Sequence, residues 1–383
     1  MLIIRRRLST VTLAKEYTQG SKVTAWISTR VRARHRADTQ IVRRQDAFKV
    51  VAGAAPGAPG PQQVVLGLVA SPVWDDDVQA LRGQSTAVGS TPGRTGLFKV
   101  DKVGKDVKRF AVGDLAMPYK AGFGTWRAHA VAAESDLVKV PAKLNSASAA
   151  VDLIAHATAI RLLDGLKKGD VVGCAGAQGP LGLALTVVGK AMGLRVVCIN
   201  GPAVDPAKGM KKLKDAGAEL VVPHEWSSGT SYTASYKFRR LVDDLPPAKL
   251  VVNIAGGSLA QDALRLLDGG GGELVTLGGA PFVVPASFFT QRLAVARGFN
   301  LAAWLKNAKL DEVQDLCDRA AQSVAATQAE FTSPVSAFAL DEASTAVDAE
   351  GFGPTPVLQV EVKRPFAQPV VETKLAKAFK ANA

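Results

Sequence analysis

A glycine-rich turn between an apolar strand and an apolar helix is the segment of the chain best suited to bind a charged ligand. Residues 171–200 read VVGCAGAQGPLGLALTVVGKAMGLRVVCIN, with Gly176, Gly179 and Gly182 in a GxxGxxG pattern. Glycines in such a turn let a pyrophosphate approach backbone N–H groups, and the helix that follows offers the positive end of its dipole. The pattern predicts a dinucleotide-binding site. The alternative is a glycine loop that serves packing alone.

The end of the second strand in this kind of site selects the cofactor. An acidic residue there holds the ribose hydroxyls of NAD, and a basic residue holds the 2′-phosphate of NADP. The chain reads Cys198-Ile199-Asn200-Gly201-Pro202 at this point and contains neither. Lys208, Lys211 and Lys212 follow on the next predicted helix. We interpret these lysines as a solvated helix face rather than a phosphate site.

Strands and helices alternate over residues 146–290. After an Ala-rich helix at 146–163, the apolar pattern predicts strands at 171–174, 195–199, 220–222, 250–253 and 273–277, separated by helices at 180–192, 206–216, 231–244 and 258–267. Strands that alternate with helices in this way predict a doubly wound parallel sheet, and therefore an α/β fold.

The segments on either side of this region differ from it. Residues 64–145 contain short apolar stretches between Gly and Asp turns, which predicts a β-rich, barrel-like domain. The chain is expected to return to that domain after residue 290. The predicted division is a basic arm at 1–44, a Gly/Ala/Pro linker at 45–63, a catalytic-type β-rich domain at 64–145 and 291–362, a nucleotide-binding domain at 146–290, and a basic tail at 363–383.

Most of the net charge of +13 lies at the two ends of the chain. Residues 1–44 contain 11 Lys/Arg and two acidic residues, and residues 361–383 contain five Lys/Arg and two acidic residues. The first 15 residues, MLIIRRRLSTVTLAK, contain no acidic residue and have the composition of a mitochondrial presequence, which predicts a location on the matrix side of mitochondria. Basic extensions also favour RNA, anionic lipid or acidic subunits as partners.

Composition argues against membrane and metal classes. No apolar run reaches the roughly 18 residues that a transmembrane helix needs. The three cysteines, Cys174, Cys198 and Cys317, are widely spaced, and the sequence predicts neither a disulfide framework nor a zinc site. Asp75–Asp77 are three consecutive acids, which we interpret as a solvated loop rather than a metal site.

Five segments carry a resemblance to a known family. They are KVDKVGKDVKRFAVGDLAMP (99–118), AGFGTWRAHAV (121–131), DVVGCAGAQGPLGLAL (170–185), VVNIAGGSLAQDALRLLDGGGGELVTLGG (251–279) and ARGFNLAAWLK (296–306). In this order they resemble the mitochondrial trans-2-enoyl thioester (enoyl-CoA) reductases, a zinc-independent branch of the medium-chain dehydrogenase/reductase superfamily. The segment at 121–131 is the most specific, and the resemblance covers roughly residues 64–360.

The resemblance implies a fold, a cofactor and a reaction. The family has a partly open β-barrel (GroES-like) catalytic domain with an inserted Rossmann domain, and its members usually form dimers, with an identical chain or a related reductase. They reduce the C2–C3 double bond of enoyl thioesters with NADPH and without zinc. The resemblance places cofactor contacts at Gly176, Ala177, Gln178, Gly179, Leu181, Gly182, Asn253, Gly256, Gly278 and Gly279.

The chain also departs from the family pattern. The family's Tyr beside the thioester, a proton donor or orienting acid, has no counterpart in Gln84-Ser85-Thr86-Ala87, where Ser85 lies nearest to its position. No catalytic residue is assigned, since Tyr119 belongs to another segment. The other departures are Pro72–Asp77 in place of Asn-Pro-Ser-Asp, Arg94-Thr95-Gly96 in place of a longer turn, Gly201 in place of Arg, and Asn300 in place of an aromatic residue.

Three functions agree with this pattern. The departures affect the proton donor, the active-site wall and the phosphate clamp, which favours a non-catalytic or weakly catalytic accessory subunit of a large mitochondrial assembly, a respiratory complex or the mitoribosome. In that case NADP binding is lost. One alternative is an active NADPH-dependent enoyl thioester reductase of mitochondrial fatty-acid synthesis, with Ser85, Thr86 or a water in place of the Tyr. The other is a quinone or aldehyde reductase, in which positioning of the nicotinamide matters more than an acid or base.

Overall fold

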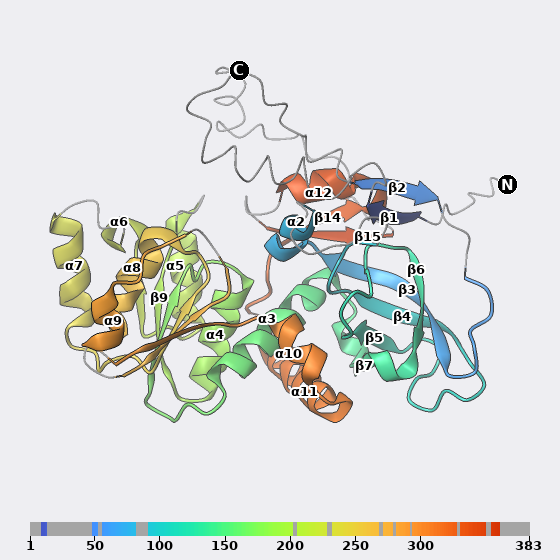
Figure 1. Cartoon of the computed structure of the whole chain (residues 1–383), viewed down its shortest axis with the longest axis horizontal. Coiled ribbons are helices and arrows are strands. Elements are labelled where there is room, and N and C mark those ends of the chain that lie inside the picture. Colours follow the sequence, from blue (N-terminus) through green and yellow to red (C-terminus); the bar gives the residue numbers. More distant parts are fainter. Residues whose placement is uncertain are drawn as a thin grey trace, which may run out of the picture.

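The chain forms two lobes that lie side by side (Figure 1). The computed structural model describes residues 9–13, 48–52, 56–81, 91–201, 205–227, 232–267, 271–278, 281–291, 293–327, 330–349 and 354–360. No helix within these ranges is long and apolar enough to cross a membrane.

The first lobe, on the left in Figure 1, is built on a six-stranded parallel sheet in the order β10-β9-β8-β11-β12-β13. The strands are β8 (Val171–Ala175), β9 (Arg195–Ile199), β10 (Leu220–Val222), β11 (Leu250–Asn253), β12 (Glu273–Thr276) and β13 (Val295–Gly298). β8 and β11 are buried at every residue, because helices cover both faces of such a sheet. From β8 the chain first builds outward to β10 and then, on the other side, to β13. This order confirms the predicted doubly wound fold and brings the carboxyl ends of the strands to one edge.

Helices connect these strands and fill the space between the lobes (Figure 1). The connecting elements are α4 (Pro180–Ala191), α5 (Pro206–Asp215), α6 (His224–Ser227), α7 (Tyr232–Val242), α8 (Gly257–Ala263), η4 (Leu264–Leu267) and α9 (Ala286–Thr290). Between the lobes lie α3 (Ala147–Leu163), α10 (Leu301–Asn307) and α11 (Leu310–Thr327). α3 begins after Ser146, whose Oγ accepts a hydrogen bond from Ala149 N at 3.1 Å and so caps the helix.

β13 extends the parallel sheet past residue 290, where the sequence-based division ends the nucleotide-binding domain. It pairs with β12 in parallel register, with Val295 opposite Glu273. All four of its residues are exposed, as on an edge strand. Its sequence, VARG, therefore lacks the apolar run by which the buried strands are recognised.

The second lobe contains a sheet in the order β14-β15-β3-β4-β5-β7, and β6 also pairs with β3. The strands are β3 (Gln63–Pro72), β4 (Leu97–Val103), β5 (Leu115–Pro118), β6 (His129–Ala133), β7 (Leu137–Val140), β14 (Val335–Ala339) and β15 (Thr355–Gln359). Short helices complete the lobe: α2 (Asp75–Leu81), η2 (Glu134–Asp136), η3 (Ala142–Leu144), η5 (Leu340–Glu342) and α12 (Ala343–Ala349). The pairings among the described strands do not close a barrel, in agreement with the partly open barrel that the family resemblance implies.

A two-stranded sheet lies within the predicted arm and linker. β1 (Ser9–Leu13) pairs antiparallel with β2 (Phe48–Ala52). The rest of the predicted arm and the basic tail lie outside the described residues.

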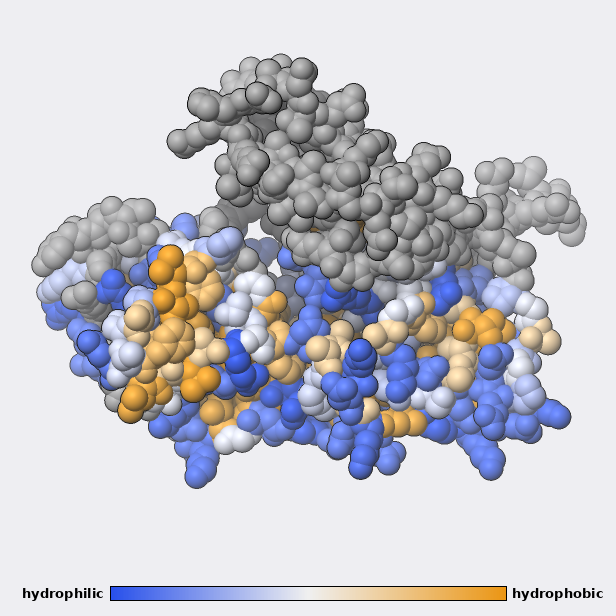
Figure 2. Space-filling model, viewed as in Figure 1, coloured by the Kyte–Doolittle hydropathy of each residue, from blue (hydrophilic) through white to orange (hydrophobic). Residues whose placement is uncertain are grey.

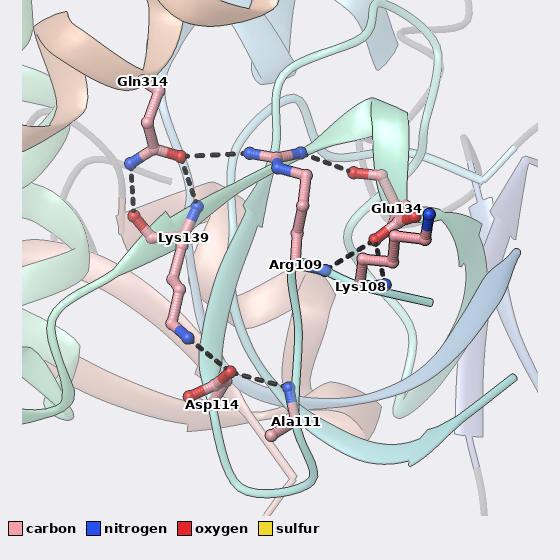
Figure 3. Close-up of polar contacts among 7 residues, drawn as sticks. All are labelled: Lys108, Arg109, Ala111, Asp114, Glu134, Lys139 and Gln314. Atoms are coloured by element: carbon pink, nitrogen blue, oxygen red, sulfur yellow. Dashed lines mark hydrogen bonds and ion pairs between the residues drawn. The ribbon is translucent and has the colours of Figure 1, made fainter. Parts of the chain in front are cut away.

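A polar network fixes α11 to the second lobe (Figure 3). Gln314 Oε1 accepts a hydrogen bond from Lys139 N at 2.9 Å, and Gln314 Nε2 donates to Lys139 O at 3.0 Å. Arg109 donates to Gln314 Oε1 at 3.3 Å and to the carbonyl of Glu134 at 2.9 Å. One side chain of α11 thus binds a strand and a loop from early in the chain, so the connection that leaves the first lobe is held on the second.

Candidate functional site

The three positions of the turn after β8 that carry glycine differ in whether the structure requires glycine there. Gly176 has a φ of +87°, and a Cβ there would lie 2.7 Å from Ala255 Cβ. A Cβ on Gly182 would lie 2.1 Å from the carbonyl oxygen of Ala177. Both positions therefore need glycine for the turn and for packing.

Gly179 is not explained by packing. Its φ of −86° is accessible to any residue, and a Cβ on it would meet no atom within 4 Å. It is the N-cap of α4 and supplies no side-chain cap, so no side chain of the N-cap residue occupies the first-turn N–H groups of the helix. Open space at the positive end of a helix suits the phosphates of a dinucleotide.

The turn is held against the end of β9. Gly176 N donates to Ile199 O at 2.9 Å, and Ala177 N donates to the same oxygen at 3.3 Å. Gln178 reaches across and accepts a hydrogen bond from Gly201 N through its Oε1 at 2.8 Å. The turn after β8 and the residues that follow β9 are thus joined by hydrogen bonds at the carboxyl edge of the sheet.

The next two carboxyl ends carry the other predicted cofactor residues. Asn253 is fully buried, accepts a hydrogen bond from Gly256 N at 2.8 Å, and donates to Thr276 Oγ1 at 3.4 Å. It therefore joins β11 to β12 and positions Gly256, whose φ is +71°. A Cβ on Gly278 would meet nothing within 4 Å, and Gly279 lies outside the described residues. All the predicted cofactor residues that are described lie at the carboxyl edge of the sheet.

The lysines predicted as a solvated face have two different environments. Lys211 pairs with Asp215 on the surface at 2.6 Å, and Lys208 is exposed. Lys212 is partly buried and donates to Thr332 O at 2.9 Å. The prediction holds for the first two, but it is wrong for Lys212, which joins α5 to the chain returning to the second lobe.

The three acids at 75–77 are not a solvated loop, so that expectation is wrong. They form the first turn of α2, where carboxylates are favoured by the helix dipole. Asp77 is buried and accepts hydrogen bonds from the backbone N–H groups of Trp74 and Arg94, each at 3.0 Å. Burial raises the pKa of Asp77 to about 7. Within the described ranges, no group of three or more His, Cys, Asp or Glu is arranged to hold a metal ion.

A second carboxylate of α2 links the lobes at the carboxyl edge. Asp76 pairs with Arg94 at 3.1 Å and accepts a hydrogen bond from Asn300 Nδ2 at 3.3 Å. Asn300 follows β13 and caps α10, accepting from Ala303 N at 3.1 Å. The residue that replaces the family's aromatic side chain therefore has a structural role in this chain, holding α2 and α10 together.

The segment most specific to the family resemblance, at 121–131, acts as a buried support. Trp126 is 0% exposed, and a Cβ on Gly93 would lie 2.2 Å from its Cδ1. Thr125 Oγ1 lies 2.8 Å from Ser71 Oγ and donates to Thr95 O at 3.0 Å. These contacts hold the segment before β4 that contains Arg94 and Thr95.

The predicted stand-in for the missing Tyr, Ser85, lies outside the described residues. Tyr119 is buried, and its hydroxyl donates to Ser135 O at 3.0 Å, so it is a structural residue of the second lobe. Sequence reasoning missed the buried Asp77 and its bonds to Trp74 and Arg94, for which its place in an acidic triplet was the only indication.

The described residues fit a dinucleotide at the carboxyl edge of the first lobe. Gly179 leaves room for a pyrophosphate at the N-terminus of α4, and Gly278, at the carboxyl end of β12, also has open space where a Cβ would lie. This arrangement supports hydride transfer by positioning.

No protein-family model matches the chain. The chain is 30% identical over 267 residues to the mitochondrial enoyl-[acyl-carrier-protein] reductase of Dictyostelium discoideum, an alignment that covers 67% of this chain and 74% of that protein. It is 31% identical over 258 residues to the human protein of the same name, covering 65% and 67%.

Solved structures share the fold at lower identity. The complex of Etr1p with NADP and crotonyl-CoA has a TM-score of 0.70 at 21% identity and covers 83% of this chain and 96% of its own. The mitochondrial 2-enoyl thioester reductase heterodimer Etr1p/Etr2p from Candida tropicalis has a TM-score of 0.70 at 20% identity, with the same coverage. From the sequence relatives, and in agreement with the fold, the chain belongs to the mitochondrial enoyl-[acyl-carrier-protein] reductase family.

Proposed function

We propose that the chain is a nicotinamide-dinucleotide-dependent reductase of trans-2-enoyl thioesters in mitochondria. The observation that carries the proposal is the open space at Gly179, the one glycine of the turn that neither backbone strain nor packing requires. The relatives are named as mitochondrial enoyl-[acyl-carrier-protein] reductases, and the Etr1p complex contains NADP and crotonyl-CoA. These findings support an active reductase. The sequence alone had favoured an accessory subunit.

The reaction adds a hydride to C3 and a proton to C2 of the enoyl thioester, and a bound nicotinamide supplies the hydride. The residues of the chain would bind and orient the reactants: the N-terminus of α4 would hold the pyrophosphate, and Asn253, which fixes the backbone at Gly256, would support the nicotinamide half. Asp77 accepts a hydrogen bond from Arg94 N and so fixes the backbone there. No residue is assigned as the proton donor, and Ser85, Thr86 or a water would take the place of the family's Tyr.

The substitution Gly179→Val tests the proposal. The valine side chain fills the space intended for the pyrophosphate, so the affinity for the dinucleotide falls on the order of a hundredfold, as phosphate contacts are lost. The melting temperature stays near that of the original chain, because the position has room and an ordinary φ. Calorimetric titration with NADH and NADPH gives the affinities, and oxidation of either cofactor with crotonyl-CoA gives the activity.

Gly57→Val is the matched control. Gly57 lies in the second lobe, and a Cβ on it also meets no atom within 4 Å. The control should bind and turn over like the original chain. If the original chain binds neither nucleotide at millimolar concentration, the reductase proposal is wrong, and the accessory-subunit hypothesis with its basic extensions becomes the better one.

A dimer through β13 is part of the proposal. Apolar side chains gather on the lobe that carries β13 and α9 (Figure 2, left). The exposed ones are Val283 (67%), Phe289 (46%), Leu293 (75%) and Val295 (57%). An open strand edge flanked by apolar side chains favours pairing with a second chain. The related structure from Candida tropicalis is a heterodimer of two such reductases.

Val295→Arg is expected to convert the dimer to a monomer. A charged side chain at the first residue of the edge strand has to be desolvated when two chains meet, which weakens association by at least about tenfold. Light scattering coupled to gel filtration measures the mass of the original chain and the variant at the same concentration. Val112→Arg is the control, since Val112 is similarly exposed, at 64%, but lies in the other lobe. A monomeric original chain contradicts the dimer.

A further inference from the structure

We infer that the adenosine end of the site accepts a dinucleotide with a free ribose 2′-hydroxyl, NADH, in preference to the 2′-phosphorylated NADPH. The inference rests on the proposed function and specifies its cofactor. It is carried by three features of the end of β9: an unpaired acceptor on Asn200, a backbone donor already occupied by Gln178, and the absence of a cation aimed at the site among the described residues.

Asn200 directly follows β9, where the adenosine ribose lies in a doubly wound fold. Its backbone N–H donates to Val222 O at 3.0 Å, which fixes the residue against β10. Its side chain is 3% exposed, and Oδ1 has no hydrogen-bond partner in the described part of the chain. A buried acceptor without a donor is costly, so a ligand that brings a hydroxyl donor is favoured there. A 2′-hydroxyl can donate, whereas a phosphate dianion offers only acceptors.

The backbone donor at this strand end is not available to a phosphate. Gly201 N donates to Gln178 Oε1 at 2.8 Å, and a Cβ on Gly201 would lie 2.5 Å from Gln178 Nε2. The glutamine side chain therefore covers the glycine that stands where the family has an arginine. An incoming phosphate would find Gly201 N already bonded and the Gln178 amide group in front of the glycine.

Among the described residues of α5, no lysine is held at this strand end in place of the missing arginine. Residues 202–204 are Pro-Ala-Val and contribute no charge. Lys212 is bonded to Thr332 O at 2.9 Å, and Lys211 is paired with Asp215 at 2.6 Å. Lys208 remains exposed, but its own backbone N–H is bonded at 3.0 Å by the carboxylate of Asp205, which caps α5. A 2′-phosphate at the start of α5 would thus meet a carboxylate before it met an ammonium group.

The expected result is that the full chain binds NADH at least about tenfold more tightly than NADPH, because the phosphate dianion must lose water beside a carboxylate without a dedicated cation. Calorimetric titration with each nucleotide measures the two Kd values and requires no turnover. Initial rates with crotonyl-CoA should show the same preference in kcat/KM.

Two variants test the assignment, each through the ratio of the Kd for NADPH to that for NADH. Asn200→Ala removes the acceptor and weakens NADH, and Asp205→Ser removes the carboxylate but keeps a helix cap and strengthens NADPH. Both lower the ratio about tenfold. Asp164→Ser, which removes a carboxylate paired with Arg161 at the end of α3, leaves the ratio unchanged. If either variant does not fold, the other still gives the answer.

The possible outcomes separate the inference from the proposed function. Equal affinities, or tighter binding of NADPH, overturn the NADH preference and leave the reductase proposal standing. Binding of neither nucleotide overturns both. A preference for NADH that neither variant reduces overturns the assignment to Asn200 and Asp205.

Discussion

Replacing Trp126 with alanine is expected to lower the free energy of unfolding by about 3–5 kcal/mol, the range for deleting a large aromatic side chain from a core. Trp126 is completely buried, and the chain at Gly93 packs directly on its indole ring. The cavity cannot close by a small shift, because Thr125 beside it is bonded to Ser71 and Thr95. Urea unfolding followed by circular dichroism measures the loss.

Trp304→Ala is the matched control. Trp304 is only partly buried in α10, and the guanidinium of Arg161 lies 4.7 Å from its ring centre. Its removal should cost clearly less than that of Trp126. Equal losses would mean that the family-specific segment at 121–131 has no special structural role, and its function as a buried support would have to be abandoned.

Acid is expected to destabilise the chain through His156. This side chain is buried in α3, with Nδ1 2.9 Å from Ser323 Oγ on α11, and burial lowers its pKa to about 4. Because the folded pKa lies below the ordinary value of 6.5, the contribution of His156 to stability is complete above pH 6.5. It is lost progressively as the pH falls toward 4 and amounts to about 3 kcal/mol. The free energy of unfolding measured at intervals from pH 7.5 to 4 gives this slope.

The variant His156→Gln isolates this contribution, since glutamine does not titrate and retains an acceptor for Ser323. The difference between the original chain and the variant should shrink as the pH falls. The free energy of unfolding of the variant has to be subtracted from that of the original chain, because Asp77 changes the stability with pH in the opposite direction. Its pKa is raised to about 7, so its contribution to stability is lost as the pH rises through 7. His129→Gln is the control, since its imidazole is partly exposed next to Asp101. A pH-independent difference for His156→Gln would rule out the titration.

The parts of the fold that the sequence predicts well are the strands that are buried at most of their residues. β9, β10 and β11 begin and end at the predicted residues, because strands covered on both faces are continuous apolar runs. β13 carries no such run, because its residues are exposed at the edge of the sheet. α2 was missed because its acids suggest a loop, whereas the buried Asp77 shows that one of them belongs to the core.

The sequence predicted where the candidate site lies, but not which of its residues would contact a ligand. The GxxGxxG pattern located the turn, because tight turns and close packing both require glycine. Which glycine serves a ligand depends on what a Cβ would meet, and only Gly179 among the three faces open space. The proposed role of Asn200 likewise depends on its side-chain oxygen, which has no hydrogen-bond partner among the described residues. The order of residues in the sequence does not show this.

The position of β15 has a consequence for how the chain is made. β15 lies between β14 and β3 in the second lobe, and Leu358 pairs with Ser71 of β3. During synthesis or import from the N-terminus, β3 emerges early, and its partner is the last described strand to follow. β6 pairs with β3 over Gln63–Gly67, but the end of the edge at Ser71 and Pro72 waits unpaired while the whole parallel-sheet lobe is produced and folds. Over that interval a chaperone that shields this edge protects the nascent chain, and a chain cut short before residue 355 exposes the edge permanently.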